Sequence, residues 1–356
     1  MSQASVKASS IKQEVHLSDD THFPPEHPKV SYGKTGVLLI NLGTPSGTDY
    51  WSMRRYLGQF LSDRRVIEVP RLIWYPILHL IILTFRPGKS GKAYAEIWNE
   101  HNESPLLTTT RNQAEQLQER MKDKNVHVDF AMRYGKPAIA DKLQAMKDAG
   151  VDRLLIFPLY PQYSATTTAT VMDEVFRKLM AMRWQPTLRS VPPFHDDPAY
   201  IEALATSVEK SMASHNINPD MLVASFHGLP KSYFMKGDPY HCQCQKTGRL
   251  LMEKLGRTRD NFMVTFQSRF GPQEWLQPYT DKSVVKLGEE EKSVAVVTPG
   301  FVTDCVETLE EISIGVHEEY EEAGGTQFNF LECLNDSEEA MNLYEHICLR
   351  ELSGWV

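Results

Sequence analysis

Residues 221–240 read MLVASFHGLPKSYFMKGDPY, and this stretch indicates the class of fold. Its first six residues are apolar apart from one small hydroxyl, which is typical of a strand buried on both faces of a parallel sheet. His227 follows where that strand ends, and Gly228 and Pro230 prevent simple continuation of the strand. Ligands of open α/β sheets gather at the carboxyl ends of strands, so His227 is a candidate ligand or proton carrier. A lone histidine beside an apolar run is nevertheless more often structural.

The rest of the chain repeats the pattern of strand, turn and helix. Apolar runs predict further strands at residues 36–42, 126–134, 153–157, 187–191, 261–267 and 293–297. Amphipathic segments between them predict helices, including one capped by Ser104 and one that ends at Gly150. Strands that alternate with helices in this way indicate βαβ units and a parallel sheet.

Two pairs of segments share a layout, which predicts two related halves: the strands that begin at Gly36 and Met221 are alike, and so are two longer segments. Residues 154–175 and 294–312 each read as an apolar strand, a proline, an aromatic loop and a helix opened by Thr or Asp. We therefore expect an α/β fold of two similar Rossmann-like halves, each a parallel sheet flanked by helices, with the ligand cleft between them. The expected boundaries are a flexible N-terminal tail (1–33), a first half (34–195) with a hydrophobic lip at about 53–90, and a second half (196–356) whose last helix packs back on the first.

Composition excludes some classes of function. The formal net charge is -8 and the sequence pI is near 5.9, so we expect no nucleic-acid partner. Five cysteines, an odd number, do not form a secreted disulfide framework and indicate a reducing compartment. Cys242 and Cys244 form a C-x-C pair, for which free thiols are favoured over a zinc or iron–sulfur site. The first thirty residues lack the basic start and apolar core of a signal peptide.

Residues 71–85 read RLIWYPILHLIILTF and form the most apolar segment of the chain. The segment is too short, and too interrupted by Pro76 and His79, to span a bilayer of about 30 Å. It can be a core helix, a lip over a pocket or an interfacial segment, and the flanking Arg71 and Arg86 suit a headgroup region. The basic cluster that follows is either a solvated loop or a contact for a carboxylate or lipid headgroup, and it contains Arg86, Lys89 and Lys92.

Acidic residues gather on a helix predicted at 304–320, directly after the Pro299-Gly300 turn. Spacings of three and four residues place Asp304, Glu307 and Glu311 on one face of that helix. Acids in a first turn suit the helix dipole, but like charges on adjacent turns repel one another. Since this face and His227 both follow strand ends, they can converge across the cleft as a metal site open to exchange. Carboxylates that continue along the helix can relay protons or guide a cation.

Several motifs together resemble the ferrochelatase family. They run in order from Gly36 to the acidic helix, and they comprise Asn41-Leu-Gly43, Tyr94 with Ser104-Pro105, Arg133-Tyr134, residues 158–164 (PLYPQYS), residues 225–230 (SFHGLP) with 237–240 (GDPY), residues 266–269 (FQSR) with Gly271-Pro272 and Trp275, and residues 301–311. One such motif is weak, whereas their shared order makes the resemblance specific.

The resemblance implies a class II chelatase-like fold and a lyase that inserts Fe²⁺ into protoporphyrin IX to form protohaem, the terminal step of haem biosynthesis. It implies that His227 and Glu307 are the pair that contacts iron and deprotonates the pyrroles. Asp304 and Glu311 resemble a proton or metal conduit that leads away from Glu307. The positions that resemble propionate contacts are Arg86, Tyr94 and Ser104. The positions that resemble other parts of the pocket lining are Leu42, Arg133, Tyr134, Ser268, Trp275 and Phe301.

The resemblance also implies where the protein works. The lip resembles the route by which a porphyrin is exchanged with a membrane, so we expect a cytoplasmic protein, peripheral on the inner face of the cytoplasmic membrane, that can contact neighbouring enzymes of the haem pathway. Fe²⁺ is a substrate, and no prosthetic group is expected. The chain lacks the cysteine-rich C-terminal extension of cluster-bearing members, so no [2Fe-2S] cluster is expected. Cys305 stands where some members have a histidine, which puts any role of that imidazole in doubt here.

Other functions remain open on the sequence. A related chelatase would act on coproporphyrin or a corrin precursor, or would insert cobalt or nickel, although the apolar lip favours the less polar protoporphyrin. A non-catalytic haem or porphyrin carrier would give no reason for the acidic row. A nucleotide-binding α/β protein is disfavoured, because no G-x-G-x-x-G or P-loop motif follows any predicted strand.

Overall fold

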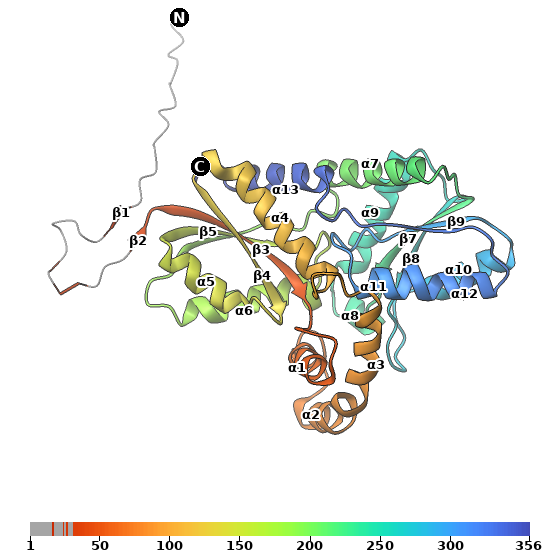
Figure 1. Ribbon diagram of the computed structural model, residues 1–356, viewed down its shortest axis with the longest axis horizontal. Helices are drawn as coiled ribbons and strands as arrows, with labels where there is room; N and C mark the ends of the chain where they lie inside the picture. The colour runs from red at the N-terminus through yellow and green to blue at the C-terminus, as the bar shows by residue number, and fades with distance from the viewer. Residues whose placement is uncertain (1–15, 18–23, 25, 28–30) are drawn as a thin grey trace, which may run out of the picture.

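The computed structural model of the chain describes residues 16–17, 24, 26–27 and 31–356. Figure 1 shows two α/β bodies side by side, with a helical projection below them. Each body contains a four-stranded sheet. The first sheet consists of β3 (Lys34–Gly43), β4 (Val126–Tyr134), β5 (Val151–Pro158) and β6 (Thr187–Ser190). The second consists of β7 (Met221–His227), β8 (Phe262–Gln267), β9 (Val294–Val297) and β10 (Phe328–Leu331).

The two sheets have the same topology. The spatial order is β4-β3-β5-β6 in the first half and β8-β7-β9-β10 in the second, so each half places its second strand beside its first, followed by the third and the fourth. All of these neighbours are parallel. The predicted α/β fold of two similar halves is therefore confirmed. Because the strands are parallel, the carboxyl ends of each sheet meet at one edge.

Helices cover both faces of both sheets. The helices of the first half are α4 (Pro105–Met121), the 3₁₀ turn η2 (Lys122–Lys124), α5 (Ile139–Asp148), the π-helical turn η3 (Ala165–Ala169) and α6 (Thr170–Met180). Those of the second half are α7 (Pro198–Ser214), α8 (Lys231–Met235), α9 (Tyr240–Lys254), α10 (Thr280–Glu289), α11 (Val306–Thr308), the π-helix η4 (Leu309–Val316), α12 (His317–Glu322) and α13 (Glu338–Glu351). Ser104 caps α4 by accepting from the backbone N–H of Leu107, as the sequence predicts.

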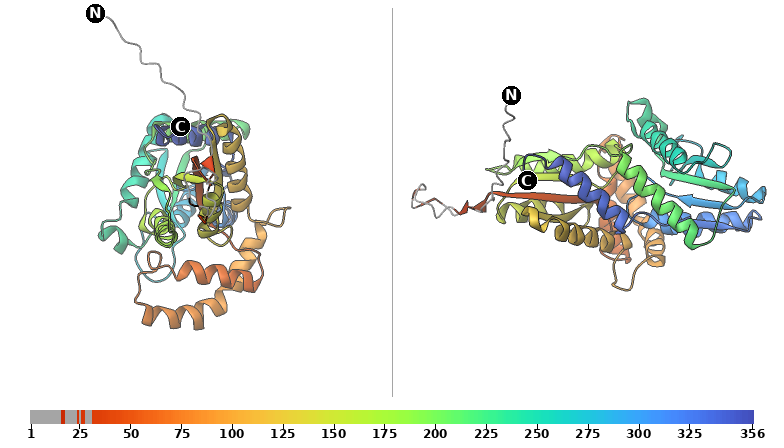
Figure 2. Two further views of the ribbon diagram at one scale, coloured as in Figure 1. Left: turned by 90° about the vertical axis from the view of Figure 1, so that its left-hand side faces the viewer. Right: turned by 90° about the horizontal axis from the view of Figure 1, so that it is seen from above.

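One hydrophobic core joins the halves. It includes Phe157 from β5, Phe226 from β7 and Tyr344 from α13, all fully buried, and the rings of Phe157 and Tyr344 lie 5.5 Å apart. The last helix, α13, also lies against α4 of the first half, because Arg120 forms salt bridges of 2.7 and 3.2 Å with Glu338 and Glu345. Figures 1 and 2 show α13 at the top of the molecule, over the first half and reaching the junction with the second. The shared core makes the space between the halves a fixed feature of the fold.

The apolar segment belongs to the projection seen in Figures 1 and 2, which we call the lip. It consists of α1 (Tyr50–Leu61), α2 (Arg71–Ile77), the π-helical turn η1 (Leu78–Ile82) and α3 (Leu83–Glu96). Pro76 does not end the helix; a π turn follows it, and π turns are a common response to disturbed helical hydrogen bonding. Trp74, Leu78 and Leu83 are buried, whereas Leu72 is 93% and Phe85 74% exposed. Among the described residues, no helix is long and apolar enough to cross a membrane.

Most of the predicted N-terminal tail lies outside the described residues. Within it, β1 (His16–Leu17) pairs antiparallel with β2 (Ser31–Tyr32). Gly43 then ends β3 with a φ of +108°, a conformation that favours glycine. A methyl group at Gly43 would lie 1.8 Å from the carbonyl oxygen of Tyr134. The Asn41-Leu-Gly43 motif is thus explained by a close approach of β3 and β4.

Candidate functional site

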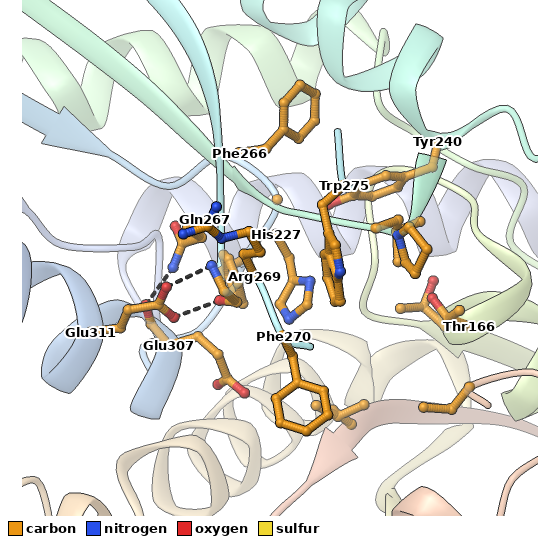
Figure 3. Close-up of a pocket in the computed structure, with 18 of the residues that line it drawn as sticks. Thr166, His227, Tyr240, Phe266, Gln267, Arg269, Phe270, Trp275, Glu307 and Glu311 are labelled. Atoms are coloured by element: carbon orange, nitrogen blue, oxygen red, sulfur yellow. Dashed lines mark hydrogen bonds between the residues drawn. The ribbon is translucent and has the colours of Figure 1, made fainter. Parts of the chain in front are cut away.

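A cavity of about 1000 Å³ lies between the halves, at the carboxyl ends of their strands. Its size is at the upper end for a site that encloses a small molecule or cofactor. Most of its lining is apolar, with polar groups confined to a few places. Of the residues predicted for the site, those that line this cavity are Leu42, Arg86, His227, Ser268, Trp275, Phe301, Glu307 and Glu311. Figure 3 shows His227, Trp275, Phe270, Glu307 and Glu311 around the same space.

His227 is the last residue of β7 and projects into the cavity. Its Nδ1 lies 2.6 Å from the carbonyl oxygen of Gly228. Because a carbonyl only accepts hydrogen bonds, Nδ1 carries a proton, and the tautomer that fits this contact keeps the lone pair on Nε2. A side chain at Gly228 would lie 2.7 Å from the carbonyl oxygen of Gln267, so glycine is needed where β7 leaves the sheet. The Ser225–Pro230 motif therefore fixes an imidazole whose Nε2 can bind a metal or accept a proton.

The acidic helix differs from the prediction in its geometry. It begins at Val306 rather than at Asp304, and it becomes the π-helix η4 after three residues. A π-helix bonds each residue to the fifth along the chain and is often found at functional sites. The wider turn changes which residues share a face, and Glu307, Glu310 and Glu311 all line the cavity, followed by Glu319 of α12. The cavity therefore has an acidic wall opposite its apolar part.

Glu311 is held by Ser268, the residue after β8. The backbone N–H and the hydroxyl of Ser268 donate to its two carboxylate oxygens at 2.6 and 2.5 Å. Burial raises the pKa of the Glu311 carboxyl, while the Ser268 hydroxyl and the nearby His227 lower that pKa and Glu307 raises it. Ser268 has a φ of +63°, which is uncommon for a residue other than glycine. The two bonds to Glu311 hold Ser268 in this conformation.

Glu310 is a member of the acidic wall to which the sequence gave no role. Burial raises the pKa of its carboxyl, and the neighbouring carboxylates of Glu96, Glu311 and Glu307 raise that pKa further, while Lys89 lowers it. The adjacent pair Glu310-Glu311 was the sequence feature that could have indicated a role for Glu310. It was missed because the spacing of an α-helix places adjacent residues on different faces. Carboxylates with raised pKa values at a cavity wall suit proton or cation transfer.

Asp304 does not line the cavity, in contrast to its predicted place in the acidic row. Its side chain is buried and accepts hydrogen bonds from Thr308 Oγ1 at 2.9 Å and Asn335 Nδ2 at 2.7 Å. The backbone N–H of Cys333 also lies 3.3 Å from this carboxylate. Because Thr308 is the last residue of α11, these contacts fix the start of the acidic helix.

The three predicted propionate contacts are divided between two cavities. Arg86 lines the main cavity, and its guanidinium lies 4.6 Å over the ring of Phe270 from the other half. Burial lowers the pKa of Arg86, while the charge of Glu307 raises it. Tyr94 and Ser104 are buried and line a second, water-sized cavity of about 10 Å³ that also borders Glu307. Tyr94 and Ser104 therefore line the small cavity beside Glu307 and do not line the main cavity.

Arg133 and Tyr134 lie outside the lining of the main cavity, in contrast to the sequence prediction. The Arg133 guanidinium forms a buried salt bridge of 2.5 Å with Asp63, which also accepts from the Tyr134 hydroxyl at 3.0 Å. Arg133 Nε donates to the carbonyl of Thr170 at 2.8 Å. These contacts join β4 to α6 and to the segment after α1. Asp63 lies far away in the sequence, so the motif alone could not identify it as the partner.

The five cysteines are free thiols. Cys242 is exposed and Cys244 is buried on α9, so the C-x-C pair does not present both thiols to one site. Burial raises the pKa of the Cys305 thiol, and the adjacent Glu307 raises it further. Across the described part of the chain, no group of three or more His, Cys, Asp or Glu side chains is arranged to hold a metal ion.

Comparisons with known proteins agree with the motifs. A family model described as ferrochelatase matches residues 34–352. The chain is 61% identical to a ferrochelatase of Allorhizobium ampelinum, with 94% of this chain and 98% of that protein covered, and 62% identical to one of Rhizobium etli with the same coverage. In fold it is similar to the structure of SirB from Bacillus subtilis with Fe³⁺, at a TM-score of 0.53, 12% identity, and coverage of 90% of this chain and 97% of that one. This last likeness shows the fold alone.

Proposed function

The chain belongs to the ferrochelatase family and inserts Fe²⁺ into protoporphyrin IX in haem biosynthesis, and we propose that His227 and Glu307 perform this insertion in the cavity between the halves. The observation that carries the proposal is that a histidine with a free Nε2 and an acidic wall line the same enclosed, largely apolar space. As a metal chelatase, the protein is a lyase.

Insertion requires two pyrrole protons to leave while a divalent cation arrives. His227 accepts these protons one at a time, because its Nδ1 donates to Gly228 and its Nε2 has a single lone pair, so the first proton passes on to solvent or to the acidic wall before the second is taken. An imidazole is suited to this step near neutral pH, where it exchanges protons readily. The orientation of the ring is fixed before the porphyrin binds, which reduces the cost of reaching the reactive geometry.

Glu307 contacts the iron from the acidic wall. Carboxylate oxygens bind Fe²⁺ without the closed cage of a structural site, so the ion can move on to the porphyrin nitrogens. Glu310 and Glu311 extend the wall along η4, and we propose that they guide iron towards Glu307 or carry protons from it. Asp304 supports this segment by fixing Thr308 at its start.

We propose that the cavity binds the macrocycle in a bent form. A planar porphyrin keeps its nitrogen lone pairs within the ring plane, whereas bending exposes them to an incoming ion. Binding that is strongest for the bent form lowers the barrier to insertion. The residues that we propose to hold the ring are Leu42, Ser268, Trp275 and Phe301, all in the lining.

Arg86 is proposed to bind a propionate, since its guanidinium lines the cavity and is suited to bidentate contact with a carboxylate. Phe270 lies over the face of the Arg86 guanidinium, which leaves the N–H edge of that group open to a carboxylate. Tyr94 and Ser104 border the small cavity next to Glu307, and they reach a propionate if that cavity joins the main one.

The lip supports a proposal about location. Its exposed apolar residues, with Arg71 at the start of α2, suit the interface of an anionic membrane. We propose that the protein works in the cytoplasm, peripheral on the inner face of the cytoplasmic membrane, where a poorly soluble porphyrin enters past the lip. A transfer contact with the preceding or following haem-pathway enzyme fits the same surface.

Fe²⁺ is proposed to act only as a substrate, with no resident prosthetic group. The cysteines support this proposal, because Cys244, Cys305, Cys333 and Cys348 are buried and separate from the exposed Cys242. A metal analysis of the purified protein tests it. We expect less than one tightly held iron per chain and no visible absorption typical of a [2Fe-2S] cluster.

Anaerobic Fe²⁺ insertion by His227→Ala and Glu307→Gln tests the proposed pair. We expect turnover to fall by about 100-fold or more in each variant, as for loss of a group that transfers protons or binds metal. Porphyrin affinity, measured by fluorescence, should change far less. Matched controls are His101→Ala and Glu100→Gln, because both side chains are exposed on the surface. Near wild-type turnover in His227→Ala and Glu307→Gln would refute the assignment.

A further inference from the structure

The two halves make contact across one edge of the cavity. Val66 and Glu68, in the segment between α1 and α2, line the cavity, and so do Tyr233 and Lys236 at α8 of the second half. The Tyr233 hydroxyl donates to the carbonyl oxygen of Val66 at 2.9 Å, and Lys236 forms a salt bridge with Glu68. We call these four residues the rim contact.

The rim contact determines which cations the cavity offers to a substrate. Within the described lining, the basic residues are Arg86, Lys236 and Arg269, and of these only Lys236 forms a salt bridge. Glu68 therefore cancels the charge of Lys236 at this edge. The neighbouring side chains of the lining are apolar, namely Val66, Ile67, Val69 and Trp74.

This distribution of charge matters because porphyrins differ in their carboxylates. Protoporphyrin IX carries both propionates on one edge of the ring and only vinyl and methyl groups on the opposite edge. Coproporphyrin III carries a propionate on every pyrrole, so it presents carboxylates at more than one edge in any orientation. An edge of the cavity without a free cation accepts vinyl groups and does not compensate a buried carboxylate.

We propose that Glu68, by neutralising Lys236, is a specificity-determining residue that favours protoporphyrin over porphyrins with more carboxylates. The proposal rests on the proposed porphyrin site between the halves. It adds that the vinyl and methyl groups of the porphyrin lie at the edge of the cavity that contains the rim contact. Arg86 and Arg269 are then the basic residues of the described lining that form no salt bridge, and Arg86 is the one proposed to bind a propionate.

The two partners of the salt bridge have opposite effects in this account. Glu68→Gln removes the counter-charge and frees Lys236 to attract a carboxylate, so it raises the ratio of kcat/KM for coproporphyrin III to that for protoporphyrin IX. Lys236→Gln leaves the Glu68 carboxylate without its cation, so it repels a propionate and lowers the same ratio. The pair is partly exposed, with side-chain exposures of 61% for Lys236 and 35% for Glu68. A shift of about threefold is therefore expected in each direction.

A purely mechanical role of the rim contact predicts a different result. Both single variants break the same salt bridge, so a tie that only holds the halves together changes the ratio in the same direction in both, or not at all. The double variant Glu68→Gln/Lys236→Gln should return the ratio close to the wild-type value, since neither charge remains. Tyr233→Phe removes the hydrogen bond without changing charge, and it should affect both porphyrins equally.

The experiment is steady-state Fe²⁺ insertion with the full chain, both porphyrins and the four variants, at low and high salt. Opposite shifts in the two single variants that shrink at high salt are the expected result. Shifts in the same direction, or unchanged ratios, overturn the proposal. All four variants should retain protoporphyrin turnover, so a failure here is distinct from failure of the proposed catalytic pair. If a glutamine variant does not fold, as judged by thermal unfolding, Glu68→Ala and Lys236→Met make the same test.

Discussion

Both the backbone N–H and the hydroxyl of Ser268 donate to the carboxylate of Glu311, at 2.6 and 2.5 Å. The contact joins the end of β8, whose last residue Gln267 lines the cavity, to the π-helix η4, which follows directly on the α11 turn that carries Glu307. Because the hydroxyl hydrogen bond lowers the pKa of Glu311 against the effect of burial, Ser268 helps to keep this carboxyl ionised.

Ser268→Ala should shift the pH dependence of activity. Loss of the hydroxyl bond raises the pKa of Glu311 further, so the carboxyl becomes protonated at a higher pH and no longer attracts Fe²⁺ there. The acid limb of kcat/KM for iron should therefore move to higher pH by about one unit. Ser283→Ala is the matched control, because its hydroxyl donates to a backbone carbonyl away from the acidic wall. An acid limb that stays in place or moves to lower pH would contradict the role of Ser268.

The variant Asp304→Asn distinguishes a role of Asp304 in stabilising the acidic helix from a direct role in transferring protons or metal. In the structure, Asp304 accepts from Thr308 and Asn335 and does not line the cavity. We expect the free energy of unfolding to fall by about 1–3 kcal/mol, with the acid limb of the pH profile unchanged. Urea unfolding and the pH profile are the two measurements. A variant with wild-type stability but very low turnover would instead support the conduit that the sequence predicts.

The salt bridge between Arg133 and Asp63 should matter for stability. Both side chains are almost fully buried, so Arg133→Met leaves the Asp63 charge without compensation. The free energy of unfolding should fall by about 3–5 kcal/mol, and the double variant Arg133→Met/Asp63→Asn should recover part of the loss. Porphyrin affinity of the folded protein should remain close to wild type. A large loss of affinity without loss of stability would place Arg133 at the porphyrin after all.

Charges in the lip should weaken membrane binding. Leu72 and Phe85 are 93% and 74% exposed, and burying each in an interface contributes about 1.5–3 kcal/mol. The variant Leu72→Glu/Phe85→Glu should therefore bind vesicles of phosphatidylcholine and phosphatidylglycerol more than about tenfold more weakly in flotation assays. Phe176→Glu is the control, since Phe176 is an exposed aromatic residue of α6, outside the lip. Equal vesicle binding by all three proteins would rule out the lip as the membrane contact.

Seven of the eight strands of the two sheets could be predicted because they are short apolar runs bounded by Gly and Pro, and β4 matches its predicted bounds. The edge strand β10 was not predicted. The helical spacing of Glu307 to Glu311 was not predictable, because a π-helix of eight residues leaves no periodic pattern distinct from an α-helix. The lip shows a similar limit, since Pro76 reads as a helix breaker although the helix continues through it.

The order of motifs predicted which residues line the cavity better than it predicted which residues bind to Arg133 and Asp304. His227, Glu307 and Glu311 lie together because each follows a strand end, which a sequence can show. The side chains of Arg133 and Asp304 are oriented by partners that are distant in the chain, Asp63 and Asn335 respectively. No local pattern in the sequence indicates these partners. Glu68 and Lys236 meet only because the two halves close on one another.

A crystal structure with protoporphyrin IX bound tests the central claim most directly. The account predicts that the ring occupies the cavity between the halves, with His227 Nε2 facing one side of the macrocycle and the Glu307 carboxylate facing the other. Both groups on the same face, or a ring bound outside this cavity, would contradict the proposed mechanism.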